Sequence, residues 1–143
     1  MRLQPGDVEL VTACASLFDH PPRERFVAAF LASAGHHLLV ALSDEGDPIG
    51  FTTGIETTHP DKGTEMFLYE LAVQPAHRRR GVGRSLVEAL ATLARERGCY
   101  GMWVATEPDN LAALATYRAA GAAPPEQFVT LSWTFAPSTA GGR

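Results

Sequence analysis

Residues 73–86 read Val73-Gln74-Pro75-Ala76-His77-Arg78-Arg79-Arg80-Gly81-Val82-Gly83-Arg84-Ser85-Leu86. The stretch before it, 65–73, is almost wholly apolar, as a central strand covered on both faces would be. From Gly83 onward, apolar residues recur at helical spacing, at Leu86, Val87, Leu90, Leu93 and Ala94. The segment therefore predicts a buried strand, a short basic turn with two glycines, and a long helix.

The junction between this strand and this helix has the chemistry of an anion-binding site. The first amide N–H groups of a helix lack internal partners, and the helix dipole adds partial positive charge there. Gly81 and Gly83 let the backbone approach a ligand closely, and arginine side chains make bidentate contacts with phosphate oxygens. The turn has neither the Gly-Lys-Ser/Thr ending of a P-loop nor the three-glycine dinucleotide spacing, which argues against both of those nucleotide sites.

The rest of the chain predicts an α/β domain on a mixed sheet. Two short helices precede a β-hairpin, and a strand, a helix and a strictly alternating last strand follow the long helix. These elements are expected at 7–17, 23–32, 37–42, 49–55, 100–106, 110–121 and 129–135. We expect one domain over 1–136 and a disordered tail at 137–143.

Composition is that of a globular protein. Hydrophobic residues make up 45% of the 143 residues and charged residues 20%. No apolar run approaches the roughly 20 residues that span a bilayer, and the N-terminal sequence is too polar for a signal peptide. We therefore expect a cytoplasmic protein that does not bind membranes. The two cysteines have no metal-ligand spacing, and no metal is expected.

The charges are unevenly distributed. The net charge is −4, yet four of the twelve basic residues lie within 78–84. A local positive site on an acidic body suits an anionic cofactor and a cationic co-substrate. Nucleic acid is not an expected partner, because it would require a broad basic face.

Two segments resemble the GNAT superfamily of N-acetyltransferases. Arg78 to Gly83 resembles its Arg/Gln-x-x-Gly-x-Gly/Ala loop, and Asn110 to Gly121 resembles its Asn-x-x-Ala-x-x-x-Tyr-x-x-x-Gly helix. The resemblance covers 65–121 well and the hairpin loosely. Within the superfamily, 67–73, 77–79 and 113–117 are most similar to aminoglycoside 3-N-acetyltransferases of the gentamicin-resistance type, with Glu70 where that pattern usually has aspartate.

The resemblance implies a GNAT-like single domain, in which a mostly antiparallel mixed sheet is flanked by helices and carries a parallel β-α-β core that binds acetyl-CoA. It implies a β-bulge in the 65–73 strand, which would splay that strand from its parallel neighbour and free backbone groups for the pantetheine arm. The expected cofactor contacts are Leu71, Ala72, Val73, Arg78, Arg79, Arg80, Gly81, Val82, Gly83, Arg84, Ser85, Asn110, Ala113 and Tyr117.

The expected reaction is direct transfer of acetyl from acetyl-CoA to a primary amine of a small molecule, such as an aminoglycoside, in a ternary complex. Glu70 is the candidate base, acting directly or through a water, or else an anchor for the acceptor; burial would raise its pKa toward neutrality. Tyr117 is the candidate acid, since a phenol titrates near 10 and a thiol near 8.5. Glu107 and Asp109 could bind a cationic acceptor, although Asp109 is equally explained as a helix N-cap.

The sequence is also compatible with other acceptors and with a different class of function. The acceptor could be a peptide or protein amine or another metabolite amine, and the chain could be a non-catalytic sensor of coenzyme A. The alternation in 129–135 also allows that strand to pair across a homodimer.

Overall fold

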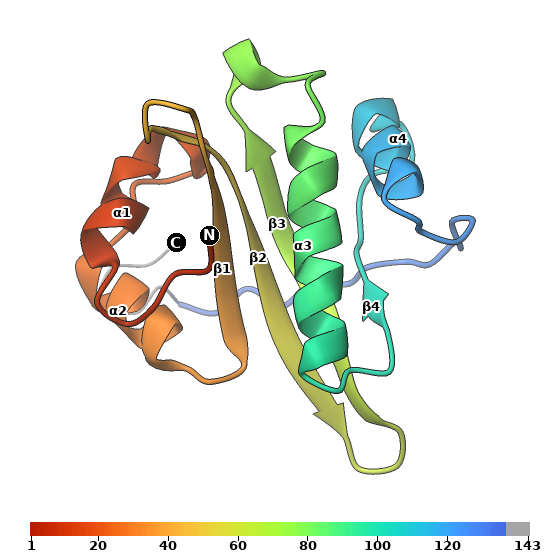
Figure 1. Cartoon of the computed structure of the whole chain (residues 1–143). Helices are drawn as coiled ribbons and strands as arrows, with labels where there is room; N and C mark the ends of the chain where they lie inside the picture. The colour runs from red at the N-terminus through yellow and green to blue at the C-terminus, as the bar shows by residue number, and fades with distance from the viewer. Residues whose placement is uncertain (137–143) are drawn as a thin grey trace.

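The computed structural model describes residues 1–136 (Figure 1). In chain order its elements are α1 (Val8–Ala13), the 3₁₀ turn η1 (Ala15–Leu17), α2 (Glu24–Ala32), β1 (His36–Leu42), β2 (Pro48–His59), β3 (Gly63–Val73), the 3₁₀ turn η2 (Pro75–His77), α3 (Val82–Glu96), β4 (Met102–Trp103) and α4 (Leu111–Ala119). The α/β class and the predicted order of these elements are confirmed.

The described strands form one mixed sheet in the order β1-β2-β3-β4. The first three are antiparallel neighbours, and β4 runs parallel to β3. The helix α3 connects β3 to β4, so the predicted parallel β-α-β core is present.

Two apolar cores lie on opposite faces of the sheet, because neighbouring residues of β1 point to opposite sides. Leu38 and Val40 belong to the core beneath α1 and α2, whereas Leu39 belongs to the core beneath α3. Figure 1 shows α3 lying along the front of β2 and β3, with α1 and α2 beside β1. Each face of the sheet is therefore covered by its own helices.

Glycines in β2 let α3 sit directly on the sheet. A Cβ atom at Gly54 would lie 2.6 Å from Leu90 Cδ1 and 2.9 Å from the Met66 sulfur. At Gly50 it would lie 3.2 Å from side chains of Leu86 and Val82. The position of α3, and of the turn that precedes it, thus depends on side chains that are absent from β2.

Two predicted strands differ from the structure. The expected strand at 100–106 is reduced to Met102–Trp103, because β4 pairs with β3 only at Met66 and Phe67. The expected strand at 129–135 is wrong, since these residues have no strand partner among the described residues. Alternation of apolar residues indicates one covered side, but a strand also needs a neighbouring backbone. The predicted disordered tail, 137–143, lies outside the described residues.

No helix within residues 1–136 combines the length and the apolar character needed to cross a membrane.

Candidate active site

A β-bulge in β3 determines where Glu70 points. Thr53 of β2 pairs with Glu70, but the next residue, Gly54, pairs with Leu68, so Tyr69 is the additional residue. Strict alternation would place Glu70 on the same face as Leu68, in the core beneath α3. The bulge turns it to the opposite face instead, beside its cross-strand neighbour Thr53. The bulge implied by the resemblance is therefore present.

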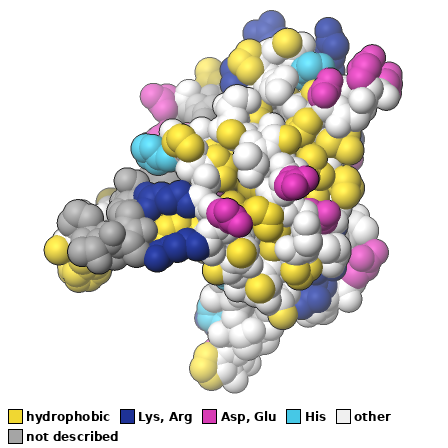
Figure 2. All heavy atoms as spheres, turned by 90° about the vertical axis from the view of Figure 1, so that its left-hand side faces the viewer, with side chains coloured by type: hydrophobic (Ala, Val, Ile, Leu, Met, Phe, Trp, Pro, Cys, Tyr) yellow, Lys and Arg dark blue, Asp and Glu magenta, His cyan; other side chains and the backbone are white. Residues whose placement is uncertain are grey.

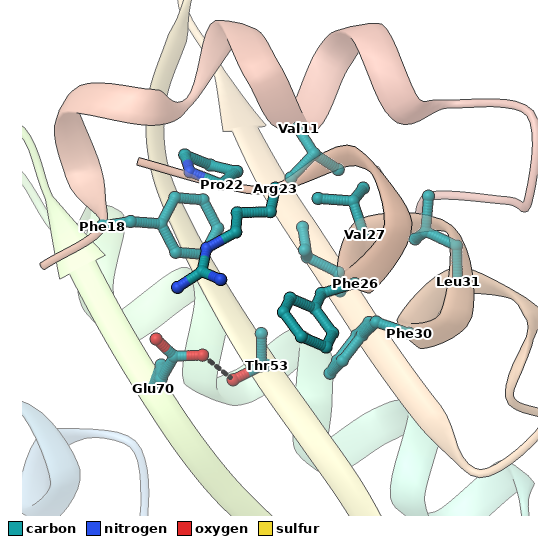
Figure 3. Close-up of a pocket in the computed structure, with 11 residues that line it drawn as sticks. Val11, Phe18, Pro22, Arg23, Phe26, Val27, Phe30, Leu31, Thr53 and Glu70 are labelled. Carbon is teal, nitrogen blue, oxygen red and sulfur yellow. Dashed lines mark hydrogen bonds between the residues drawn. The ribbon is translucent and has the colours of Figure 1, made fainter. Parts of the chain in front are cut away.

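Glu70 lines a pocket between the sheet and the N-terminal helices. The pocket has a volume of about 180 Å³. Figure 3 shows the Glu70 carboxylate and Thr53 on the strand side of this pocket, facing side chains from α2 and from the segment before it. The lining residues are Val11, Phe18, Pro22, Arg23, Phe26, Val27, Phe30, Leu31, Leu38, Thr53 and Glu70.

Burial raises the pKa of the Glu70 carboxyl above its ordinary value. The Thr53 hydroxyl donates a hydrogen bond of 3.2 Å to Glu70 Oε1, which lowers the pKa and opposes part of this shift. The negative charge of Asp19 acts in the same direction as burial. A carboxyl with a raised pKa is a better proton acceptor near neutral pH than an ordinary glutamate.

Beyond Phe67, β3 and β4 separate, and one edge of β3 loses its strand partner. The Gln74 amide donates to Ile49 O of β2 at 2.8 Å. Because hydrogen-bonding direction alternates along an antiparallel strand, Leu71 and Val73 then direct their backbone groups away from β2, toward the gap. This arrangement agrees with the expectation that their backbone is available to a ligand, although Val73 O accepts a 3.2 Å hydrogen bond from Arg78 Nε.

The turn before α3 leaves the first amides of this helix without a side-chain cap. Gly81 occupies the N-cap position in the left-handed conformation, with φ of 80°, and has no side chain to accept from those amides. Arg79 also has a positive φ, 62°. Arg78, Arg79 and Arg80 are exposed around this turn. The structure therefore combines free helix amides and cationic side chains in the way that an anionic ligand requires.

Arg84 already forms an ion pair with a side chain of α3. Its Nε lies 2.7 Å from Glu88 Oε1, one turn further along α3, in an exposed pair. Ser85 is exposed on the first turn of the same helix, and its amide donates to Gly81 O at 2.9 Å. Contact of either side chain with a cofactor stays a prediction.

Gly83 acts at the contact between α3 and α4. A Cβ atom there would lie 3.3 Å from Thr116 Cγ2, tighter than ordinary van der Waals contact. The sequence suggested that this glycine lets the backbone approach a ligand. In the structure, its nearest neighbour is Thr116 of α4, the residue before Tyr117.

Tyr117 packs against the core beneath α3 and is half-buried. Burial raises the pKa of its phenol, which keeps the group protonated at neutral pH. Its hydroxyl makes no hydrogen bond with any residue that the structure describes. The phenol is thus a protonated donor whose position is fixed by packing.

Asn110 caps α4, since its Oδ1 accepts a 3.1 Å hydrogen bond from the Ala113 amide. This bond gives Asn110 and Ala113 a structural role that needs no ligand. Their contact with a cofactor stays a prediction. The N-cap is Asn110 and not Asp109. Glu107 and Asp109 lie exposed in the loop before α4 and are not among the residues that line the Glu70 pocket.

The aromatic lining of the pocket was not anticipated from the sequence. Phe26 and Phe30 are four residues apart on α2, so they share a helical face. That spacing is usual for side chains that pack in a core. The sequence offers no further signal, since the 47% exposure of Phe26 is visible only in the structure.

Within residues 1–136, no group of three or more histidine, cysteine, aspartate or glutamate side chains is placed to hold a metal ion.

The described domain matches the model of the acetyltransferase (GNAT) family over residues 8–122. The chain belongs to this family. Its members use acetyl-CoA, and the uncapped turn before α3, with its exposed arginines, suits the phosphates of such a ligand. The cationic side chains of the turn could bind the phosphates of coenzyme A. The unpaired edge of β3 could bind its extended pantetheine arm.

The names of two similar proteins state different acceptors. A streptothricin acetyltransferase of Streptomyces lavendulae is 31% identical over 88 residues, which is 62% of this chain and 45% of that protein. A ribosomal protein bS18 alanine N-acetyltransferase of Escherichia coli K12 is 37% identical over 57 residues, 40% of this chain and 38% of that protein. The chain thus spans less than half of the length of these relatives.

A solved structure shares the fold over nearly the whole chain. An aminoglycoside acetyltransferase from an uncultured soil metagenomic sample, in complex with sisomicin, superposes with a TM-score of 0.87. The match covers 95% of both chains at 21% sequence identity. At this identity the likeness shows a common fold.

Proposed function

We propose that this protein transfers acetyl from acetyl-CoA to a primary amine of a small molecule, in a ternary complex. The observation that carries the proposal is the bulge at Tyr69, which takes Glu70 out of the core and into a pocket where burial raises its pKa. The pocket lies on one face of β3, and beyond Phe67 one edge of the same strand has no strand partner among the described residues. An acceptor and a thioester can therefore approach β3 from two directions.

Glu70 accepts the proton that the acceptor ammonium must lose before its nitrogen can attack. Acetyl-CoA supplies the acetyl group as a thioester. A backbone N–H on the free edge of β3, at Leu71 or Val73, is positioned to stabilise negative charge on the carbonyl oxygen. We assign no nucleophilic role to Cys14 or Cys99, because neither lines the Glu70 pocket and burial raises the pKa of both thiols.

Tyr117 donates the proton that the departing sulfur takes up. Its raised pKa ensures that the proton is present at neutral pH, and packing against the core beneath α3 fixes the ring. The turn 78–85 holds the phosphates, with Arg78, Arg79 and Arg80 as exposed cations around the amides that Gly81 leaves uncapped.

Aminoglycosides are the first acceptors to test, because a solved relative of the same fold binds one, and modification of such antibiotics would confer resistance. The name of the E. coli relative points to a protein N-terminus instead. A sensor that binds coenzyme A without turnover is the non-enzymatic alternative. The raised pKa of Glu70 in its pocket and the protonated phenol of Tyr117 support the enzyme over the sensor.

The partner that we propose for the C-terminal segment is a second copy of the chain. Four apolar residues that alternate with other residues in this segment are each between 76% and 86% exposed: Val129, Leu131, Trp133 and Phe135. Such exposure is unusual for apolar side chains. β4 ends the described sheet, and its Trp103, 44% exposed, stacks on Phe67 with ring centroids 4.2 Å apart. Pairing of this segment with β4 of another copy would cover both surfaces; a monomer in sedimentation at micromolar concentration would contradict the pairing.

The test of the proposed reaction is release of coenzyme A thiol from acetyl-CoA in the presence of amines. The panel comprises aminoglycosides, polyamines, amino acids and lysine peptides, with wild type, Glu70→Gln and Tyr117→Phe assayed side by side. We expect turnover with a small amine and large losses in both variants, with acetyl-CoA binding retained. Acetyl-CoA binding without turnover of any amine would support the sensor, and absence of binding would remove the proposal.

A further inference from the structure

The pocket that contains Glu70 has an almost entirely apolar lining. Of its lining side chains, only Thr53, Glu70 and Arg23 are polar. Three phenylalanines contribute rings to it, Phe18 from the segment after η1 and Phe26 and Phe30 from α2, as Figure 3 shows. An apolar wall gains most from a ligand whose own surface is apolar.

The lining of the pocket offers one carboxylate to an ammonium group, and the charge of Asp19 lies near it, outside the lining. Glu70 is the one acidic side chain in the lining. At the outer part of α2, Arg25 lies 4.5 Å from the ring centroid of Phe26, and Arg23 lies 5.5 Å from it. On this side of the molecule Figure 2 shows hydrophobic atoms between two groups of basic atoms. A second ammonium group enclosed by the lining would be desolvated without a carboxylate of the lining to pair with, and one beside Arg25 would meet a like charge.

The size of the pocket leads to the same conclusion. Its volume of about 180 Å³ is smaller than the roughly 300–1,000 Å³ of pockets that enclose drug-sized ligands. An aminoglycoside is a drug-sized polycation with several sugar rings. A single aromatic or short alkyl group with one amine is of a size that this pocket can enclose.

We infer that the acceptor is a monoamine whose amine is attached to an aromatic or alkyl group, rather than a polycationic aminoglycoside or polyamine. The inference rests on the proposed function. The ammonium lies at Glu70 and gives up its proton there, while the apolar group packs among Phe18, Phe26 and Phe30.

Binding and turnover of four probes test this inference at neutral pH. The probes are 2-phenylethylamine, ethylamine, spermidine and sisomicin, titrated calorimetrically into the full chain saturated with coenzyme A and then assayed with acetyl-CoA. We expect 2-phenylethylamine to bind at least tenfold more tightly than any of the other three. Tighter binding of spermidine or sisomicin, or no binding of 2-phenylethylamine, would overturn the inference.

A matched pair of variants locates the preference. Phe26 and Leu42 are 47% and 39% exposed, and each can be changed to aspartate. Phe26→Asp should weaken 2-phenylethylamine at least tenfold and narrow its advantage over spermidine, whereas Leu42→Asp, outside the pocket, should leave both affinities unchanged. Equal effects of the two variants would contradict the assignment. Preferential binding without turnover would reject the proposed reaction and retain the inference about the pocket.

Discussion

At the scale of single residues, three effects shift the pKa of Glu70, and two of them can be removed by single substitutions. Burial and the charge of Asp19 raise it, and the hydrogen bond from Thr53 lowers it. The active form of a base is the deprotonated one, so the acid limb of kcat/KM follows this pKa. The limb should therefore lie above the pH range of an ordinary glutamate.

Thr53→Val and Asp19→Asn should move that acid limb in opposite directions. Thr53→Val keeps the side-chain shape and removes the hydrogen bond, so the pKa of Glu70 rises and the limb moves to higher pH. Asp19→Asn removes a nearby negative charge, so the limb moves to lower pH. The measurement is kcat/KM against pH for the three proteins. Superimposable profiles would show that Glu70 is not the titrating base.

The sequence identified Glu70 and Tyr117 as candidates, yet it contained no signal for the face on which Glu70 lies. A bulge adds one residue to a strand and changes no composition, so alternation alone would have buried this carboxylate beneath α3. The resemblance supplied the bulge, and pairing of Thr53 with Glu70 places it at Tyr69. Phe26 and Phe30 were missed as pocket residues because their spacing on α2 is also that of side chains packed in a core.

At the scale of elements, α3 contacts α4 between Gly83, just after the turn 78–81, and Thr116, beside Tyr117. Gly83→Ala would add a methyl group 3.3 Å from Thr116 Cγ2 and should displace α4. We expect kcat/KM for acetyl-CoA to fall several-fold in this variant. Thr116→Ser removes the opposing methyl group, so the double variant should recover most of the loss, as contacting residues do in a double-mutant cycle.

Equal losses in Gly83→Ala and in the double variant would mean that the glycine acts through the ligand and not through α4. The two variants are compared by steady-state kinetics with acetyl-CoA as the varied substrate.

The long elements were predicted well because burial gives them periodicity. Apolar residues at helical spacing located α3, and the apolar run located β3. The short β4 and the segment 129–135 were predicted poorly, because pairing depends on a neighbouring backbone that lies far away in the sequence. The same alternation, which predicted a strand that this chain does not form, supports the proposal that the segment pairs with a second copy.

At the scale of the whole molecule, a network of polar side chains around the buried His37 joins both strands of the first hairpin to the end of α3. His37 Nε2 lies 2.7 Å from Glu56 Oε2, and Arg97 Nε donates to the same oxygen. Arg2 donates to His37 Nδ1 at 3.1 Å. An arginine can only donate, so Nδ1 is the acceptor and His37 is neutral with its proton on Nε2.

Burial lowers the pKa of His37, and the fold should lose stability as the pH falls below about 6.5. In that window the unfolded chain takes up a proton that folded His37 does not, so the free energy of unfolding decreases by at most about 1.4 kcal/mol per pH unit from this group. Urea unfolding between neutral and mildly acidic pH measures the slope. His37→Gln should flatten it, and an unchanged slope would assign the effect to other groups.

The pH dependence of the defect in Glu70→Gln tests most directly whether Glu70 is the base of an acetyl transfer. The ratio of wild-type to variant kcat/KM, with 2-phenylethylamine and with any other amine that turns over, is measured from neutral pH upward. We predict a defect of about 100-fold or more at neutral pH, typical for loss of a general base. It should shrink as pH approaches the amine pKa, about 10 by analogy with lysine, because free amine needs no base. A ratio that stays constant with pH would contradict proton abstraction by Glu70 and leave it as an anchor for the acceptor.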